Sequence, residues 1–275
     1  MNTTMMLNTT TPGEASDLQV IQDGPVLRLT LNRPDKRNAL SRTLIADLTH
    51  ALTGVQAGGT IRVVVLAGNG NVFCAGGDIK EFAAAARSGL AEAEAEGLAD
   101  LFDAITTCPV PIIARVHGSA FGGGVGLVSA CDIAIADSGT RFALSEARLG
   151  LVAAVISRYV IAALGWRAAR AHMMRGASFD AVEALRCGLV HEVTATDDLD
   201  QAVEQAVADV LKCAPGALAT AKRLPESIDG PEPASRREAT IRILAKCLDS
   251  EETQEGLNAF LEKRAPAWVT EPGDR

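Results

Sequence analysis

The sequence predicts an α/β fold in which short buried strands alternate with glycine turns and helices. Short runs rich in β-branched residues occur at Ile61–Leu66, Ile112–Val116 and Ile133–Ile135. Such short apolar runs, bounded by turn residues, are typical of strands that are covered on both faces. Glycine-rich turns follow the first two runs, and helical patterns come after the turns. This recurrence of strand, turn and helix indicates the α/β class.

The composition excludes several classes of protein. The chain has 275 residues, 48% of them hydrophobic, and a net charge of −8, so it buries a substantial core and is not a disordered tail. Acidity and an aromatic content of 4% argue against nucleic acid as a partner. No signal peptide or membrane-length apolar run is present, and six cysteines without C-x-x-C spacing predict neither a metal site nor disulfides. We therefore expect a cytoplasmic protein without a membrane partner.

Residues 1–16 are expected to form a flexible tail, and the first elements follow it. Leu18–Leu31 alternates around Asp23-Gly24-Pro25, which predicts a hairpin. Ser41 is a suitable N-cap for a helix with apolar residues at helical spacing. The Ala- and Glu-rich segment Asp78–Thr107 predicts one or two helices, with Gly89 and Gly97 as possible breaks.

Strand patterns stop beyond Val193, and the rest of the chain is predicted to be helical. The expected elements are helices near Leu199–Cys213 and Pro215–Leu224, a linker at Pro225–Pro233, and two further helices of which the last is Glu251–Arg264. This pattern predicts a core domain over residues 17–195 and a helical C-terminal region over residues 196–275.

Two glycine-rich turns are the most informative part of the sequence. They read Phe73-Cys74-Ala75-Gly76-Gly77-Asp78 and Phe121-Gly122-Gly123-Gly124-Val125-Gly126. Glycine allows unusual φ angles and close approach of a ligand, so each turn can leave a backbone N–H free at the start of a helix. Two such N–H groups at one point would make an oxyanion hole. Glycines that merely allow tight strand-to-helix packing are the alternative. P-loop, G-x-S-x-G and H-E-x-x-H motifs are absent.

Four motifs together resemble the crotonase (enoyl-CoA hydratase/isomerase) superfamily. They are Leu31-Asn32-Arg33-Pro34 with Asn38-Ala39-Leu40, the first glycine turn with Ile79-Lys80-Glu81, Gly122-Gly123-Gly124 with Cys131-Asp132-Ile133, and Ser145-Glu146 with Arg148-Leu149-Gly150. The resemblance implies a crotonase-like spiral of repeated ββα units. It also implies a helical C-terminal part for trimerisation, and a homotrimer or a hexamer of two stacked trimers.

The resemblance also implies the catalytic residues. The backbone N–H groups of Gly77 and Gly123 would bind the thioester carbonyl oxygen, and Glu146 would be the acid/base. Many hydratases of the family have a second glutamate, where this chain has Gly126. The resemblance therefore implies a hydratase with a single glutamate. A double-bond isomerase, which needs one carboxylate, and a non-catalytic member that binds CoA esters are the alternatives.

The strings around Gly126, Glu146 and Ala154 look like those of branched glutaconyl-CoA hydratases, of the methylglutaconyl-CoA and isohexenylglutaconyl-CoA types. The second carboxylate of such a substrate predicts a cation in the pocket, for which Arg148 and Arg158 are candidates. Further substrate-binding residues are expected from the resemblance, namely Lys36, Arg37, Ala75, Phe260 and Lys263. No separate cofactor is expected, because coenzyme A is part of the substrate.

Overall fold

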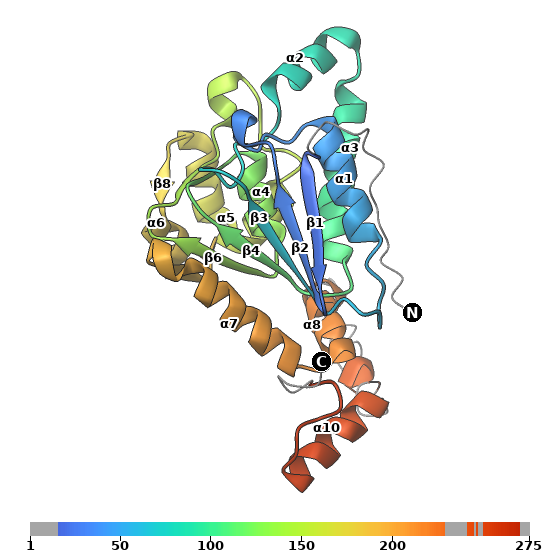
Figure 1. Ribbon diagram of the computed structural model, residues 1–275. Coiled ribbons are helices and arrows are strands. Elements are labelled where there is room, and N and C mark those ends of the chain that lie inside the picture. Colours follow the sequence, from blue (N-terminus) through green and yellow to red (C-terminus); the bar gives the residue numbers. More distant parts are fainter. Residues whose placement is uncertain (1–15, 229–240, 245, 247–249, 270–275) are drawn as a thin grey trace.

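A computed structural model describes residues 16–228, 241–244, 246 and 250–269 (Figure 1). Its main sheet has six strands in the order β1-β2-β3-β4-β6-β9, and a smaller sheet has the order β5-β7-β8. Strands β1 and β2 pair antiparallel, whereas β2, β3, β4, β6 and β9 run parallel. The strands are β1 (Leu18–Asp23), β2 (Val26–Leu31), β3 (Val63–Gly68), β4 (Ile112–Val116), β5 (Ser119–Phe121), β6 (Ile133–Asp137), β7 (Arg141–Ala143), β8 (Phe179–Asp180) and β9 (Glu192–Thr194).

Helices connect these strands and continue beyond them. The α-helices are α1 (Arg42–Thr53), α2 (Ile79–Ser88), α3 (Ala91–Thr107), α4 (Gly123–Ala130), α5 (Ser157–Arg175), α6 (Ala181–Arg186), α7 (Leu199–Lys212), α8 (Pro215–Ile228) and α10 (Glu251–Glu262). Three short 3-10 helices are η1 (Pro34–Lys36), η2 (Glu146–Leu149) and η3 (Thr196–Asp198).

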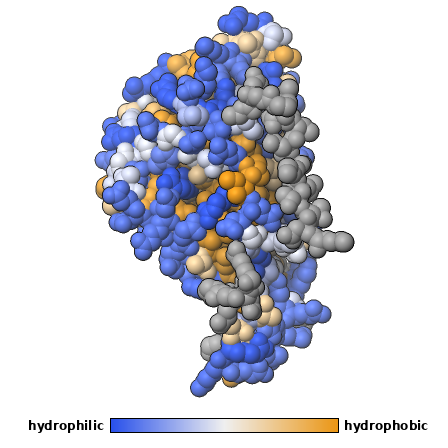
Figure 2. Space-filling model, in the orientation of Figure 1, coloured by the Kyte–Doolittle hydropathy of each residue, from blue (hydrophilic) through white to orange (hydrophobic). Residues whose placement is uncertain are grey.

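Alternate residues of the main sheet enter two separate cores. On β3, Val64 and Leu66 pack with the buried side chains of α1, α3 and α4, whereas Val63 and Val65 pack against α7. The sheet is therefore covered by helices on both faces over its parallel strands (Figure 1), which explains why β3 carries no polar side chain. Strand β1 forms one edge of this sheet and exposes Val20 and Ile21. The surface over β1 and β2 is hydrophobic (Figure 2).

Most predicted elements are present, with shifted boundaries. The hairpin, the Ser41 N-cap and the helix break at Gly89 are confirmed. Gly97 does not interrupt α3, because one glycine weakens a helix without ending it. The strand predicted at Ile61–Leu66 instead runs from Val63 to Gly68. Between residues 150 and 193 the sequence analysis assigned no element, yet α5, β8, α6 and β9 lie there.

The helical C-terminal region is partly joined to the core. The predicted boundary at residue 195 falls just before η3 and α7, and α7 packs on the sheet. The predicted linker begins too early, because α8 continues through Pro225 to Ile228; residues 229–233 lie outside the described residues. Lys222 of α8 anchors this helix by donating to the Ile105 and Val110 carbonyls and to Asp132. None of the helices in the described part combines the length and hydropathy of a membrane crossing.

Candidate active site

The first glycine turn is held between two neighbouring chain segments. On one side Leu40 pairs with Gly77, and on the other Cys74 pairs with Ala120, which lies in β5. Gly76 has φ +93°, a conformation that favours glycine, and its N–H donates to the sulfur of Cys74 at 3.4 Å. Burial raises the pKa of the Cys74 thiol to about 12, so the thiol is neutral. The turn then ends at Asp78, whose carboxylate caps α2.

The second glycine turn places another N–H at the start of a helix. Gly122 is the N-cap of α4 with φ +50°, and its N–H donates to the carbonyl of Ala143. Gly123 is the first residue of α4. The first N–H groups of a helix have no partner within it and carry its positive partial charge. Cys74 of the first turn pairs with Ala120 of β5, the strand that leads into the second turn, so the two turns lie side by side.

The N–H groups of Gly77 and Gly123 are neighbours. A β-carbon added to Gly123 would be 3.6 Å from the Gly77 nitrogen, and one added to Gly76 would be 3.3 Å from the Gly123 nitrogen. Within the part of the chain that the structure describes, neither N–H donates a hydrogen bond to another group of the protein. The pair therefore has the arrangement that binds an oxyanion.

The carboxylate of Glu146 lies against the second glycine turn. Glu146 opens η2, and a β-carbon on Gly122 would be 3.2 Å from its Oε1 and 4.0 Å from the α-carbon of Gly76. Its other oxygen, Oε2, is buried and has no hydrogen-bond partner in the described part of the chain. Burial raises the pKa of this carboxyl group above its ordinary value. A partly buried acid with a free oxygen beside two unpaired N–H groups is suited to proton transfer.

Apolar side chains fill the space beside Gly126, the residue at which a second glutamate was considered. Gly126 is buried in α4, and a β-carbon there would be 2.5 Å from Ile156 Cγ2 and 2.8 Å from Phe102 Cζ. On α3, Asp103 accepts from Arg158 and from the Tyr159 hydroxyl. No carboxylate therefore occupies the space beside Gly126.

The two candidate arginines differ in their surroundings. Arg158 pairs with Asp103 and contacts the Tyr159 ring, with its guanidinium carbon 4.6 Å from the ring centroid. Arg158 is thus an intrachain partner, and the expectation that it binds a substrate carboxylate is not supported. Arg148 is exposed on η2, packs its side chain against Gly176, and forms no ion pair with the other described residues.

Of the predicted substrate-binding residues, three lie beside the first glycine turn. Lys36 ends η1 and is exposed, as is Arg37, which follows it with φ +52°. Ala75 donates its N–H to the carbonyl of Arg37 at 3.0 Å. The structure therefore brings Lys36, Arg37 and Ala75 together with Gly77.

The other two predicted residues lie elsewhere in the chain. Phe260 is in α10, and its side chain is outside the described residues; Lys263 follows α10, is exposed and has φ +55°. In a single chain α10 lies at the end of the molecule opposite α2 (Figure 1). The structure does not bring these two residues to the glycine turns within one chain.

Phe82 of α2 was not predicted as a residue of the site. Its ring lies so close to Gly77 that a β-carbon on Gly77 would overlap it. An aromatic residue one turn after a glycine-rich helix start was the available signal.

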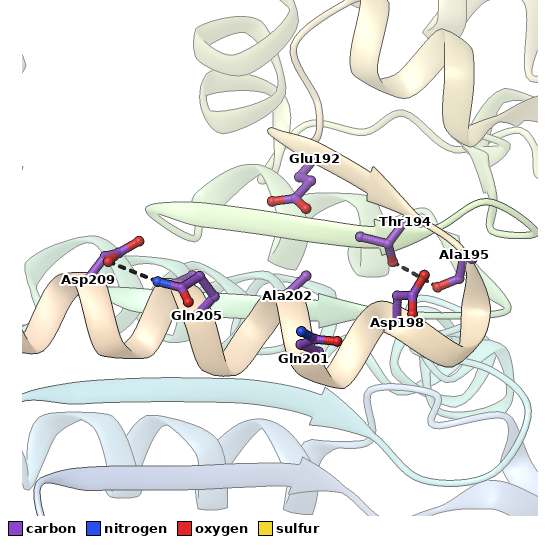
Figure 3. Close-up of a pocket in the computed structure, with 9 residues that line it drawn as sticks. Glu192, Thr194, Ala195, Asp198, Gln201, Ala202, Gln205 and Asp209 are labelled. Carbon is purple, nitrogen blue, oxygen red and sulfur yellow. Dashed lines mark hydrogen bonds between the residues drawn. The ribbon is translucent and has the colours of Figure 1, made fainter. Parts of the chain in front are cut away.

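A hollow with a volume of about 520 Å³ lies away from the glycine turns, between β9 and α7 (Figure 3). Its acids Glu192, Asp198 and Asp209 are unsuited to phosphates. No three potential metal ligands cluster in the described residues.

A carboxyl group beside two unpaired N–H groups is an arrangement suited to stabilising an enolate, and similarity to known proteins shows the family of the chain. Residues 22–271 match the model of the enoyl-CoA hydratase/isomerase family. A putative enoyl-CoA hydratase from Thermus thermophilus is 32% identical over 250 residues, covering 90% of this chain and 98% of that protein. Pseudomonas aeruginosa AtuE has a TM-score of 0.88 and 35% identity, covering 92% of this chain and all of that one.

The chain belongs to the enoyl-CoA hydratase/isomerase family, the crotonase superfamily. The predicted α/β crotonase fold is confirmed by this match and by the solved structures, among them an enoyl-CoA hydratase from Shewanella pealeana with a TM-score of 0.87, 38% identity, and coverage of 92% and 96% of the two chains. The protein is an enzyme of the enoyl-CoA hydratase kind, and an acyl-CoA thioester fits as its substrate.

Proposed function

We propose that this enzyme adds water to the 2,3 double bond of a branched glutaconyl-CoA, of the 3-methylglutaconyl-CoA or isohexenylglutaconyl-CoA type. The observation that carries the proposal is the position of Glu146. Its carboxylate contacts Gly122 and has a buried oxygen without a partner, beside the N–H groups of Gly77 and Gly123. The acid/base and the oxyanion donors thus face one small region.

In the proposed reaction Glu146 carries out both proton transfers, from water and then to C2. The thioester oxygen accepts hydrogen bonds from the N–H groups of Gly77 and Gly123, which stabilise the enolate. A water oxygen bonds to C3, its proton passes to the Glu146 carboxylate, and the π electrons of the double bond move into the enolate. Glu146 then returns the proton to C2. The product carries hydroxyl at C3 and hydrogen at C2, and the carboxylate is regenerated.

Two relatives support a substrate with a branch or a second carboxylate. An Escherichia coli relative, 32% identical, is named 2,3-dehydroadipyl-CoA hydratase, and an Aspergillus fumigatus relative, 36% identical, is named mevalonyl-coenzyme A hydratase sidH. The first name denotes a dicarboxylic acyl group, and the second denotes an acyl group branched at C3. Arg148, exposed two residues after Glu146, is the cation we assign to the distal carboxylate.

For the CoA moiety we assign Lys36, Arg37 and Ala75, with Phe260 and Lys263 supplied by a neighbouring subunit. Three subunits would form a homotrimer, alone or stacked as a hexamer, in the cytoplasm. The exposed Trp166 and Met174 of α5 and Val182 of α6 are apolar surface that such contacts would cover. Light scattering on the purified protein tests the mass of the assembly.

The deciding experiment follows the loss of enoyl absorbance with crotonyl-CoA, 3-methylglutaconyl-CoA and a long branched glutaconyl-CoA. We expect the wild-type enzyme to hydrate a glutaconyl ester and Glu146→Gln to lose this activity. The control is Glu192→Gln, at an exposed residue of β9, which should keep the wild-type rate. Faster turnover of crotonyl-CoA than of both glutaconyl esters would contradict the proposal of a branched substrate. No turnover with any ester would overturn hydration.

Isomerisation is the second candidate, favoured by the apolar surroundings of Gly126. Moving a double bond needs proton transfer between carbons and no held water, so one carboxylate is sufficient. Deuterium entering the acyl chain in D₂O without formation of a hydroxyacyl product would support it. Binding of CoA esters without either reaction would identify a non-catalytic member.

A further inference from the structure

Asn38 is a completely buried polar residue beside the active site. It lies in the loop after β2 with φ +52°. Its side-chain oxygen accepts from the N–H of Arg33 at 2.9 Å. Its amide nitrogen donates to the carbonyls of Asn69 at 2.9 Å and Val72 at 2.7 Å. Both amide protons and the amide oxygen are therefore bonded, and the side chain fixes the loop to the segment after β3.

The loop that Asn38 fixes forms one wall of the first glycine turn. The carbonyl of Arg37 accepts from Ala75 at 3.0 Å, and Leu40 donates to the carbonyl of Gly76 at 2.8 Å. The carbonyl of Leu40 accepts from Asp78 at 3.0 Å. These three bonds hold the chain immediately before and after Gly77, so the direction of the Gly77 N–H depends on where residues 37–40 lie.

The same loop reaches the second oxyanion donor. A β-carbon on Gly123 would be 3.1 Å from the Cδ1 atom of Leu40, so the Leu40 side chain fits beside the start of α4. At its other end the loop carries Lys36 and Arg37, both exposed, which the proposed function assigns to coenzyme A. Asn38 is therefore the buried link between the assigned CoA-binding residues and the donors of the oxyanion hole.

We infer that Asn38 is a positioning residue that couples binding of the nucleotide part of coenzyme A to placement of the Gly77 N–H. The inference rests on the proposed function, because it needs a CoA thioester held at Lys36, Arg37 and Gly77. Binding energy from a remote part of a substrate accelerates a reaction when it is used to orient groups at the reacting centre. A rigid loop fixed by three hydrogen bonds provides that connection.

The test compares two thioesters of one acyl group, the enoyl-CoA and the enoyl-pantetheine, which lacks the nucleotide. For the wild-type enzyme we expect kcat, and not KM alone, to be at least about tenfold lower with enoyl-pantetheine. Asn38→Asp keeps the shape of the side chain but cannot donate to Asn69 and Val72. In this variant we expect kcat with enoyl-CoA to fall by the same factor of about ten or more, while kcat with enoyl-pantetheine changes little, so that the kcat values of the two thioesters become nearly equal.

Two further variants separate coupling from general loss of structure. Asn38→Gly tolerates the positive φ and should remain folded, as thermal unfolding will verify. It should lose the difference in kcat between enoyl-CoA and enoyl-pantetheine. Asn71→Asp makes the same chemical change at an exposed residue nearby and should keep the wild-type ratio of the two kcat values.

Each unfavourable outcome has a separate meaning. Equal wild-type kcat for both thioesters, or an equal fall for both in Asn38→Asp, would overturn the coupling and leave the proposed function intact. A wild-type enzyme that hydrates neither thioester would overturn the proposed function and the coupling together.

Discussion

Gly126 lies with its α-carbon directly against Ile156, so that a β-carbon at residue 126 would be 2.5 Å from Ile156 Cγ2. Phe102 closes the same space from α3, 2.8 Å from that β-carbon. The space beside Gly126 is therefore already filled, and neither water nor a larger side chain fits there. The surroundings of Gly126 are apolar and close-packed, which agrees with the proposed reaction on a single acid.

Replacing Gly126 with glutamate should harm the protein without improving catalysis. The added side chain overlaps Ile156 and Phe102, so we expect Gly126→Glu to lower the free energy of unfolding by about 1–3 kcal/mol or more. Urea denaturation measures that loss, and the hydration assay measures kcat. Combining Gly126→Glu with Ile156→Ala should recover part of the stability. Higher kcat in a fully stable Gly126→Glu enzyme would contradict the close packing described around Gly126.

Removing the acid of Glu146 should abolish most of the activity. We expect Glu146→Gln to lower kcat by about 10²- to 10⁴-fold, because glutamine cannot take or return a proton. Initial rates at saturating enoyl-CoA measure this, and the KM should change little. An unchanged kcat would show that another group transfers the proton.

The difference in stability between Glu146→Gln and the wild type should depend on pH. Burial raises the pKa of Glu146 in the folded protein above its value of 4.5 in the unfolded chain, so folding favours the protonated form. Below the unfolded value both states are protonated and no cost arises; above the folded pKa the buried charge lowers stability. Glu146→Gln removes the charge, so its Tm should exceed that of the wild type at neutral pH. The difference should vanish as the pH falls through the folded value towards 4.5, and calorimetry across this range detects it. A Tm difference that grows towards acidic pH would contradict the sign.

Filling the space between the two N–H donors should slow the reaction. The β-carbon of Gly123→Ala would lie 3.6 Å from the Gly77 nitrogen, where the thioester oxygen has to bind. We expect kcat to fall about 10²- to 10³-fold, the effect of losing one oxyanion donor. The matched control is Gly97→Ala, whose β-carbon meets no atom within 4 Å. Wild-type kcat in Gly123→Ala would contradict the assigned oxyanion hole.

The control makes a prediction of its own. Gly97 lies inside α3, where alanine is favoured over glycine by roughly 0.5–1 kcal/mol. We therefore expect Gly97→Ala to raise the free energy of unfolding by about that amount in chemical denaturation, with unchanged kcat. A loss of stability would indicate that the open space beside Gly97 is needed.

Local sequence signals were sufficient for the elements with strong patterns. Runs such as Val63–Leu66 are apolar at every position because helices cover both faces of the sheet. Asp78 and Ser41 cap helices as their side chains predict. Helix α5 was missed because its apolar and charged residues lack a clear helical face, and it contains the non-helical Gly165. Pro225 was taken as a helix end, although α8 passes through it.

By itself the sequence determined the fold class and the family resemblance, and through that resemblance it predicted the acid and the two glycine donors, because these depend on residue types in short motifs. Only the tertiary structure decided which groups meet. It placed Glu146 against Gly122, filled the space at Gly126 with Ile156 and Phe102, and engaged Arg158 with Asp103. Each of these contacts joins segments at least 20 residues apart. Their formation depends on how helices pack on the sheet, which no local pattern of residues specifies.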